Sequence, residues 1–172
     1  MTPFHRAAAR LLAAAALCTA PAAFAEGFQA DIGLGSANSS QSGVHAQSAI
    51  IIDLGFGYRF TPNVGVRALA FGEFAGNRIG GADQPSLKDF TGLEATGHAA
   101  LAPNINAMGG LGLGTVSYFS AFDGSAKSSQ TTPVLSGGLQ WKPRQHFAME
   151  LHADYLTSAK VLNYALLFEI PF

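Results

Sequence analysis

Hydrophobic and polar residues alternate one by one along several segments of the chain, which is the period of a β-strand with two different faces. Residues 52–60 carry Ile, Leu, Phe or Tyr at every second position and polar residues or glycine between them. Residues 28–34, 147–155 and 162–172 alternate in the same way. The pattern predicts an all-β protein.

Weaker alternation marks further strands. Residues 64–73 alternate until Leu69 and Phe71 place large apolar groups on the polar face. Residues 93–101 and 111–115 are the centres of two more candidate strands. No apolar run of 18 or more residues follows residue 25, so the mature chain is not predicted to cross a membrane as a helix.

Three short turn motifs are evenly spaced along the chain. They contain Pro62, Pro103 and Pro143, which lie 41 and 40 residues apart. A period of about 40 residues accommodates two strands of about 9–11 residues, one tight turn and one longer loop. Three tight turns, with both termini on the same side, predict eight antiparallel up-and-down strands. Longer polar connections are expected at roughly 36–47, 76–88, 120–130 and 157–160, and the third tight turn at 142–145.

The N-terminus has the features of an export signal. A basic, acid-free segment precedes an apolar stretch at residues 11–20, and residues 23–25 (Ala-Phe-Ala) form a small-x-small cleavage site. A membrane-spanning or amphipathic N-terminal helix is the alternative, but the apolar stretch is shorter than the about 20 residues that a span needs. We therefore expect residues 1–25 to be a signal peptide and residues 26–172 to form the barrel domain.

Composition removes several classes of function. The chain is 48% hydrophobic and 12% charged with a formal net charge of −1, so it has no basic surface for nucleic acid. Cys18 is the only cysteine, which excludes an intramolecular disulfide and a multi-cysteine zinc site.

An alternating barrel can turn its apolar face inward, as a soluble lipocalin does, or outward into lipid. Aromatic residues are expected near both rims, which favours lipid. An alternating apolar series runs to the chain end and includes the aromatic residues of the predicted assembly signal, Tyr164, Phe168 and Phe172; the series is Leu162, Tyr164, Leu166, Phe168, Ile170 and Phe172. This pattern resembles the C-terminal signature strand that delivers outer-membrane barrels to their assembly machinery. With the export signal and the 40-residue period, the chain resembles the small eight-stranded barrels of the OmpA and OmpX type.

The resemblance implies an eight-stranded transmembrane β-barrel in the outer membrane. Its partners would be outer-membrane lipid, lipopolysaccharide and the barrel-assembly machinery, with an extracellular ligand possible through the loops. No peptidoglycan-binding domain is expected after the barrel. The predicted role is structural or one of surface interaction.

Eight strands enclose a lumen that side chains can fill, so a general porin is not expected. We predict a polar, packed lumen, because charges of both signs there must pair or remain hydrated. A narrow ion channel lined by Arg59, Arg67, Glu73 and Glu94 is the alternative. The predicted lumen charge network consists of Asp53, Arg59, Arg67, Glu73, Glu94, Glu150, His152 and Asp154.

The sequence motifs give little support to an enzymatic function. No histidine is followed two positions later by serine, which excludes the His-x-Ser pair of deacylase-type barrels. His152 and Asp154 share a strand face and could couple near the outer rim, but no serine is tied to them by sequence. A lipid-modifying hydrolase or acyltransferase using His152 or His45 is therefore the alternative function. No catalytic residue, metal ligand or cofactor is predicted.

Overall fold

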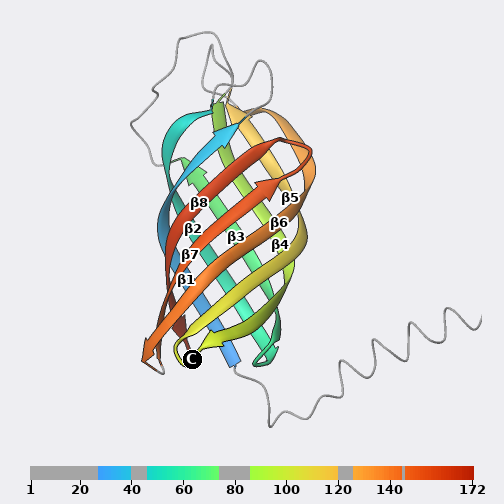
Figure 1. Ribbon diagram of the computed structural model, residues 1–172. Helices are drawn as coiled ribbons and strands as arrows, with labels where there is room; N and C mark the ends of the chain where they lie inside the picture. The colour runs from blue at the N-terminus through green and yellow to red at the C-terminus, as the bar shows by residue number, and fades with distance from the viewer. Residues whose placement is uncertain (1–26, 40–45, 74–85, 120–125, 145) are drawn as a thin grey trace, which may run out of the picture.

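The computed structural model describes residues 27–39, 46–73, 86–119, 126–144 and 146–172. The predicted signal peptide lies outside these residues. The described chain forms a closed barrel in which each strand pairs antiparallel with its sequence neighbours (Figure 1). The strands are β1 (Gly27–Ser39), β2 (Ala46–Thr61), β3 (Val64–Glu73), β4 (Ser86–Ala102), β5 (Ile105–Phe119), β6 (Ala126–Arg144), β7 (Phe147–Leu156) and β8 (Val161–Pro171). The predicted eight-stranded up-and-down barrel is confirmed.

The first and last strands close the barrel. Strand β1 pairs with β8 from Gln29 opposite Pro171 to Ser39 opposite Val161. The main chains of Phe28 and Phe172 extend this ladder by two hydrogen bonds of 3.1 and 2.8 Å. Because every strand has two neighbours, the described sheet has no unpaired edge.

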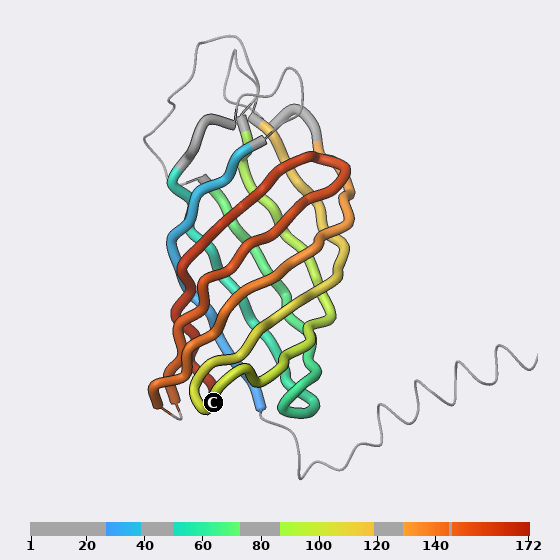
Figure 2. The backbone as a smooth tube through the Cα atoms, in the orientation of Figure 1, coloured from blue at the N-terminus to red at the C-terminus, as the bar shows by residue number. Residues whose placement is uncertain are grey.

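All three short turns lie at one end of the barrel, the short-turn end, together with the C-terminus (Figure 2). The predicted turns at Pro62 and Pro103 are confirmed. The third prediction is wrong by about two residues, because β6 continues to Arg144 before the chain reverses. Pro143 falls where the pairing register of β6 with β7 shifts, so its missing N–H removes no bond from a regular ladder.

The strands also extend into segments that were predicted to be loops at the opposite end, the long-loop end. Strand β1 reaches Ser39, and β4 and β6 begin at Ser86 and Ala126. Polar residues are accommodated there because backbone pairing continues whatever the side chains are. The short connection predicted at 157–160 is confirmed by a turn of the same residues. No helix that could cross a membrane occurs in the described part of the chain.

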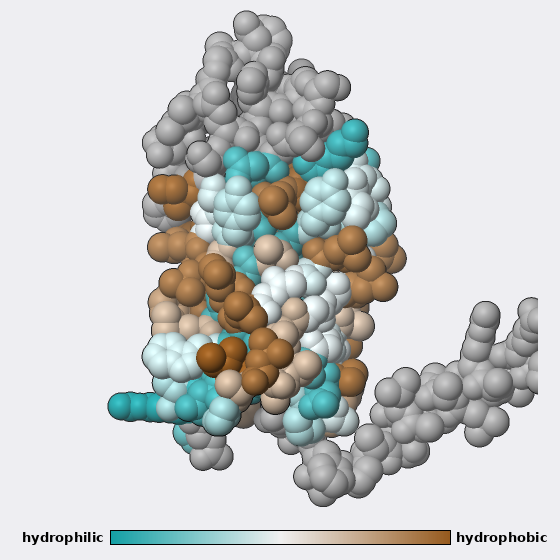
Figure 3. All heavy atoms as spheres, in the orientation of Figure 1, coloured by the Kyte–Doolittle hydropathy of each residue, from teal (hydrophilic) through white to brown (hydrophobic). Residues whose placement is uncertain are grey.

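The outer wall of the barrel is apolar. Leu34, Leu54 and Leu111 point away from the lumen and are about half to two thirds exposed, whereas the charged residues on the inner face of the sheet are buried. Figure 3 shows hydrophobic residues over much of the visible wall and strongly hydrophilic ones mainly toward the two ends. The predicted direction of the faces, apolar side outward, is confirmed.

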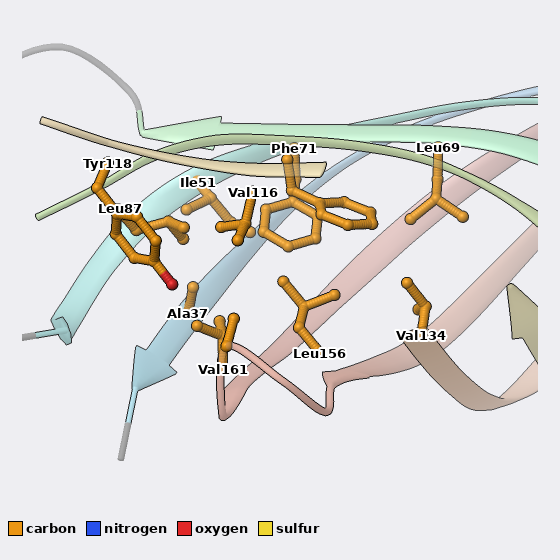
Figure 4. Close-up of a cluster of buried hydrophobic side chains, with 12 residues drawn as sticks. Ala37, Ile51, Leu69, Phe71, Leu87, Val116, Tyr118, Val134, Leu156 and Val161 are labelled. Carbon is orange, nitrogen blue, oxygen red and sulfur yellow. The ribbon is translucent and has the colours of Figure 1, made fainter. Parts of the chain in front are cut away.

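The interior is layered along the barrel axis. Its middle and short-turn end are polar, but its long-loop end is filled by a cluster of buried hydrophobic side chains, the apolar plug (Figure 4). The expectation of a polar lumen is therefore wrong for this end. Leu69 and Phe71, which interrupt the alternation of β3, point inward and belong to the plug. Its members are Ala37, Ile51, Leu69, Phe71, Leu87, Phe90, Val116, Tyr118, Val134, Leu156, Ala159 and Val161.

Two glycines make room for the Phe90 ring in the plug. A Cβ on Gly92 would lie 2.7 Å from the Phe90 ring, and a Cβ on Gly114 would lie even closer to it. Phe90 is completely buried and stacks on Phe71 with ring centroids 4.9 Å apart. The glycines of β4 and β5 therefore allow an aromatic pair to fill the lumen.

Candidate functional site

Arg67 of β3 is the centre of a buried ionic network below the apolar plug. Its guanidinium donates to Glu94 Oε1 at 2.8 Å from both Nε and Nη2. Its Nη1 lies 3.5 Å from Glu150 Oε1 and 3.8 Å from Asp31 Oδ2. Ser136 donates its hydroxyl to the second oxygen of Glu94. One guanidinium thus joins carboxylates from three other strands.

The imidazole of His152 lies between two carboxylates of its own strand. Its Nδ1 is 2.7 Å from Glu150 Oε1, and its Nε2 is 2.8 Å from Asp154 Oδ1. Arg67 Nη2 also approaches the ring, 2.8 Å from Nε2. Glu150, His152 and Asp154, at alternate positions of β7, are therefore linked to one another on the lumen side. His152 is 2% exposed and lies below the plug rather than near the rim, which corrects its expected position.

An amide extends the network to β2. Asn163 of β8 donates from Nδ2 to Asp53 Oδ2 at 2.8 Å and to Asp154 Oδ2 at 3.2 Å. The amide separates two carboxylates that would otherwise repel each other. We call the set Asp31, Asp53, Arg67, Glu94, Ser136, Glu150, His152, Asp154 and Asn163 the central network.

A second cluster lies toward the short-turn end. Arg59 donates from Nε to Gln29 Oε1 at 2.8 Å, and its Nη2 lies 3.2 Å from Glu169 Oε1. Gln140 donates to the other oxygen of Glu169 and accepts from Asn106 Nδ2 at 3.1 Å. These five residues, the lower cluster, join β1, β2, β5, β6 and β8 across the lumen.

The described lumen contains more acid than base. Six buried carboxyl side chains share it with the two guanidinium groups of Arg59 and Arg67. Burying a carboxylate is unfavourable unless it is paired or hydrogen-bonded. Donors other than arginine, namely His152, Asn163, Gln140 and Ser136, supply the additional hydrogen bonds.

Most of the predicted network residues meet in these two clusters. Arg59 belongs to the lower cluster, and the side chain of Glu73 lies outside the described residues. The other six, Asp53, Arg67, Glu94, Glu150, His152 and Asp154, belong to the central network.

Sequence reasoning did not identify the neutral partners. Asn163, Ser136 and Gln140 were overlooked because they carry no charge. Their inward positions follow from alternation, since Asn163 lies between Leu162 and Tyr164 on the outer face. A search for buried polar residues of any kind on the inner face would have found them.

In the described lumen His152 is not paired with a serine hydroxyl. Both ring nitrogens of His152 face carboxylates, and the hydroxyl of Ser136 donates to Glu94. A serine nucleophile requires a hydroxyl bound to its base. Among the described residues, no group of histidine, cysteine and acidic side chains could hold a metal ion. His45, the other candidate base, lies outside the described residues.

The three residues of the predicted assembly motif lie on the outer wall of β8 and at its end. Tyr164 is near the long-loop end, where its hydroxyl accepts a hydrogen bond from Asn38 Nδ2 at 2.6 Å. Phe168 and Phe172 lie toward the short-turn end, and Phe172 stacks on Phe28 with centroids 6.2 Å apart. All three side chains are exposed outside the barrel.

Comparison with known families identifies the barrel. The model of the outer membrane protein beta-barrel domain matches residues 9–165. The chain belongs to this family. The family places the protein in the bacterial outer membrane, so the apolar wall faces lipid. No curated protein sequence matches the chain.

Solved structures share the fold of this outer-membrane barrel. Neisserial surface protein A is similar with a TM-score of 0.59 and 15% identity, over 87% of this chain and 97% of that one. The N-terminal barrel of Pseudomonas aeruginosa OprF has a TM-score of 0.58 and 15% identity, over 84% and 97%. Ail, the attachment invasion locus protein of Yersinia pestis, has a TM-score of 0.55 and 20% identity, over 85% and 99%.

Proposed function

We propose that the protein is a non-enzymatic, non-conducting outer-membrane anchor that acts in envelope structure or surface interaction through its outer loops. The apolar plug is the observation that carries this proposal. Ile51, Phe90, Val116 and Leu156 are completely buried across the long-loop end of the lumen. An apolar constriction opposes the passage of water and ions.

The two polar clusters support the same role. Arg59 and Arg67 connect most of the strands to one another through the hydrogen bonds and ion pairs of the two clusters. A lumen that is filled by its own side chains rigidifies the barrel. Outer-membrane lipid and lipopolysaccharide are the proposed partners of the apolar wall, and an extracellular ligand is the proposed partner of the loops.

Planar bilayers and lipid A analysis test the proposal directly. The purified barrel is expected to give no discrete conductance steps, and deleting its gene is expected to leave the number of acyl chains on lipid A unchanged. Conductance steps that vanish when Arg67 and Glu94 are exchanged would show a narrow channel instead. A change in acyl-chain number would show a lipid-modifying enzyme.

Complementation separates the two forms of the proposed role. Cells that lack the gene receive either the wild type or a variant whose segments 40–45, 74–85 and 120–125 are replaced by short turns. Rescue of detergent resistance by both forms indicates a structural anchor. Rescue of a surface phenotype by the wild type alone indicates interaction through the loops, and failure of both forms in every assay contradicts the proposal.

A further inference from the structure

In outer-membrane barrels the short turns face the periplasm, so the short-turn end is the periplasmic end. The lumen opens there into a cavity of about 590 Å³, which we call the vestibule. Strands β1, β6, β7 and β8 form its wall at the short-turn end. Arg59, Gln29 and Glu169 of the lower cluster lie at its inner side, and Pro143 and Pro171 contribute apolar surface. The vestibule is thus a concave site with both polar and apolar walls.

Basic side chains of the β6–β7 hairpin line this cavity. Lys142 follows the outward-facing Trp141, so alternation turns it toward the barrel axis. Arg144 and His146 also line the vestibule and are exposed. In the part of the chain that the structure describes, Arg144 and His146 form no ion pair with an acidic side chain.

The acidic groups of the vestibule already have partners. Glu169 is its one described acidic side chain, and Arg59 and Gln140 bind it. The chain end lies at the rim, where the Phe172 carbonyl oxygen accepts the Phe28 amide at 3.1 Å. The mouth of the vestibule is therefore more basic than its floor.

From this juxtaposition we propose that the vestibule binds a phosphate-bearing anion from the periplasmic side, held by Lys142, Arg144 and His146. An arginine fork suits the oxygens of a phosphate, and lysine adds a point charge. Several cations on one hairpin suit the anionic oxygens that a phosphate monoester and a phosphodiester both carry. The phosphate could be soluble or belong to an inner-leaflet phospholipid at the rim, and the two sources share this chemistry.

The test uses the full barrel refolded in phosphatidylcholine nanodiscs. Glycerol 3-phosphate is titrated in, and binding is followed by NMR shifts of the His146 ring and of Arg144. Saturable shifts are expected for the wild type, with affinity reduced roughly tenfold in the Arg144→Gln/His146→Asn variant because two charge-assisted donors are lost. The matched control is Lys160→Gln, an exposed cation at the opposite end, which should leave binding unchanged.

A second arm replaces part of the phosphatidylcholine with phosphatidylglycerol and adds no soluble phosphate. Shifts of Arg144 and His146 in this arm alone identify the lipid headgroup as the source, and shifts with glycerol 3-phosphate identify a soluble ligand. No saturable shift in either arm overturns the proposal. An equal loss of affinity in the Lys160→Gln control overturns it as well. Retained heat-modifiable gel mobility shows that each variant is folded.

Discussion

At the scale of single residues, Arg67 connects several strands across the lumen of this barrel. It is 4% exposed and contacts carboxylates of β1, β4 and β7. A buried ion pair is a weak source of net stability, but removing one partner leaves the other charge uncompensated. Arg67 therefore matters for stability because its removal would leave buried carboxylates without a charged partner.

Replacement of Arg67 by methionine is expected to lower the free energy of unfolding by about 3–5 kcal/mol, because Glu94 would lose its charged partner. Urea unfolding in detergent micelles measures the change. The control is Lys88→Met, since the Lys88–Asp89 pair is about 40% exposed and such pairs contribute about 0–1 kcal/mol. Equal losses in both variants would contradict the central role of Arg67.

Gly114 offers a second prediction at this scale. A Cβ there would meet the buried Phe90 ring, and overpacking of this kind costs about 1–3 kcal/mol. We expect Gly114→Ala to destabilise the barrel in the same unfolding assay. Gly109→Ala is the matched control on β5, because its nearest atom would be 3.9 Å away. Adding Phe90→Leu should recover part of the loss in Gly114→Ala, and no recovery would place the strain elsewhere.

At the scale of elements, β8 has two separate tasks. Two of its inward residues, Asn163 and Glu169, complete the two polar clusters, while its outward residues are apolar. Its end closes the ladder with β1 through Phe172. The same alternation that builds the barrel wall also forms the predicted assembly motif.

Substitution of Phe172 by serine separates assembly from folding. Its side chain is exposed, and its two ladder bonds use only the main chain, so the purified variant should refold in micelles as the wild type does. In cells we expect less heat-modifiable protein in the outer membrane, because the predicted assembly motif is altered. Phe56→Ser, which changes another exposed ring of the same aromatic group, is the control. Equal effects of the two variants in cells would contradict a special role of the chain end.

At the scale of the whole molecule, closure makes the barrel one cooperative unit. Each strand is hydrogen-bonded on both sides, and the plug and the two polar clusters connect strands across the lumen. Opening one strand pair therefore also disrupts packing inside. Detergents that solvate the outer wall leave these internal contacts intact.

The intact barrel is expected to resist sodium dodecyl sulfate until it is heated. Unboiled and boiled samples of the outer-membrane fraction should run at different positions on a gel, because only boiling opens the closed sheet. A protein that fractionates with soluble periplasmic proteins and shows one mobility would contradict this expectation.

Alternation determined the class of fold, and the spacing of the turns determined the strand number. The direction of the faces followed from the aromatic residues and the C-terminal pattern. A strand has a period of two, so a sequence such as that of residues 52–60 specifies both sides of the wall without any long-range information. The prolines specified the turns to within about two residues. The predicted strand ends were less accurate at the long-loop end. Backbone pairing continues there through polar residues, so β1, β4 and β6 are longer than their side-chain pattern indicates.

Only the tertiary structure decided which inward residues meet. Asp53 and Asp154 are far apart in the chain, and the curvature of the closed sheet brings them to one amide of Asn163. Leu69 and Phe71 interrupt the alternation of β3, and the fold places them with Phe90 in the apolar plug. Period and turn chemistry are local properties, whereas contacts across a lumen depend on the register of all eight strands at once.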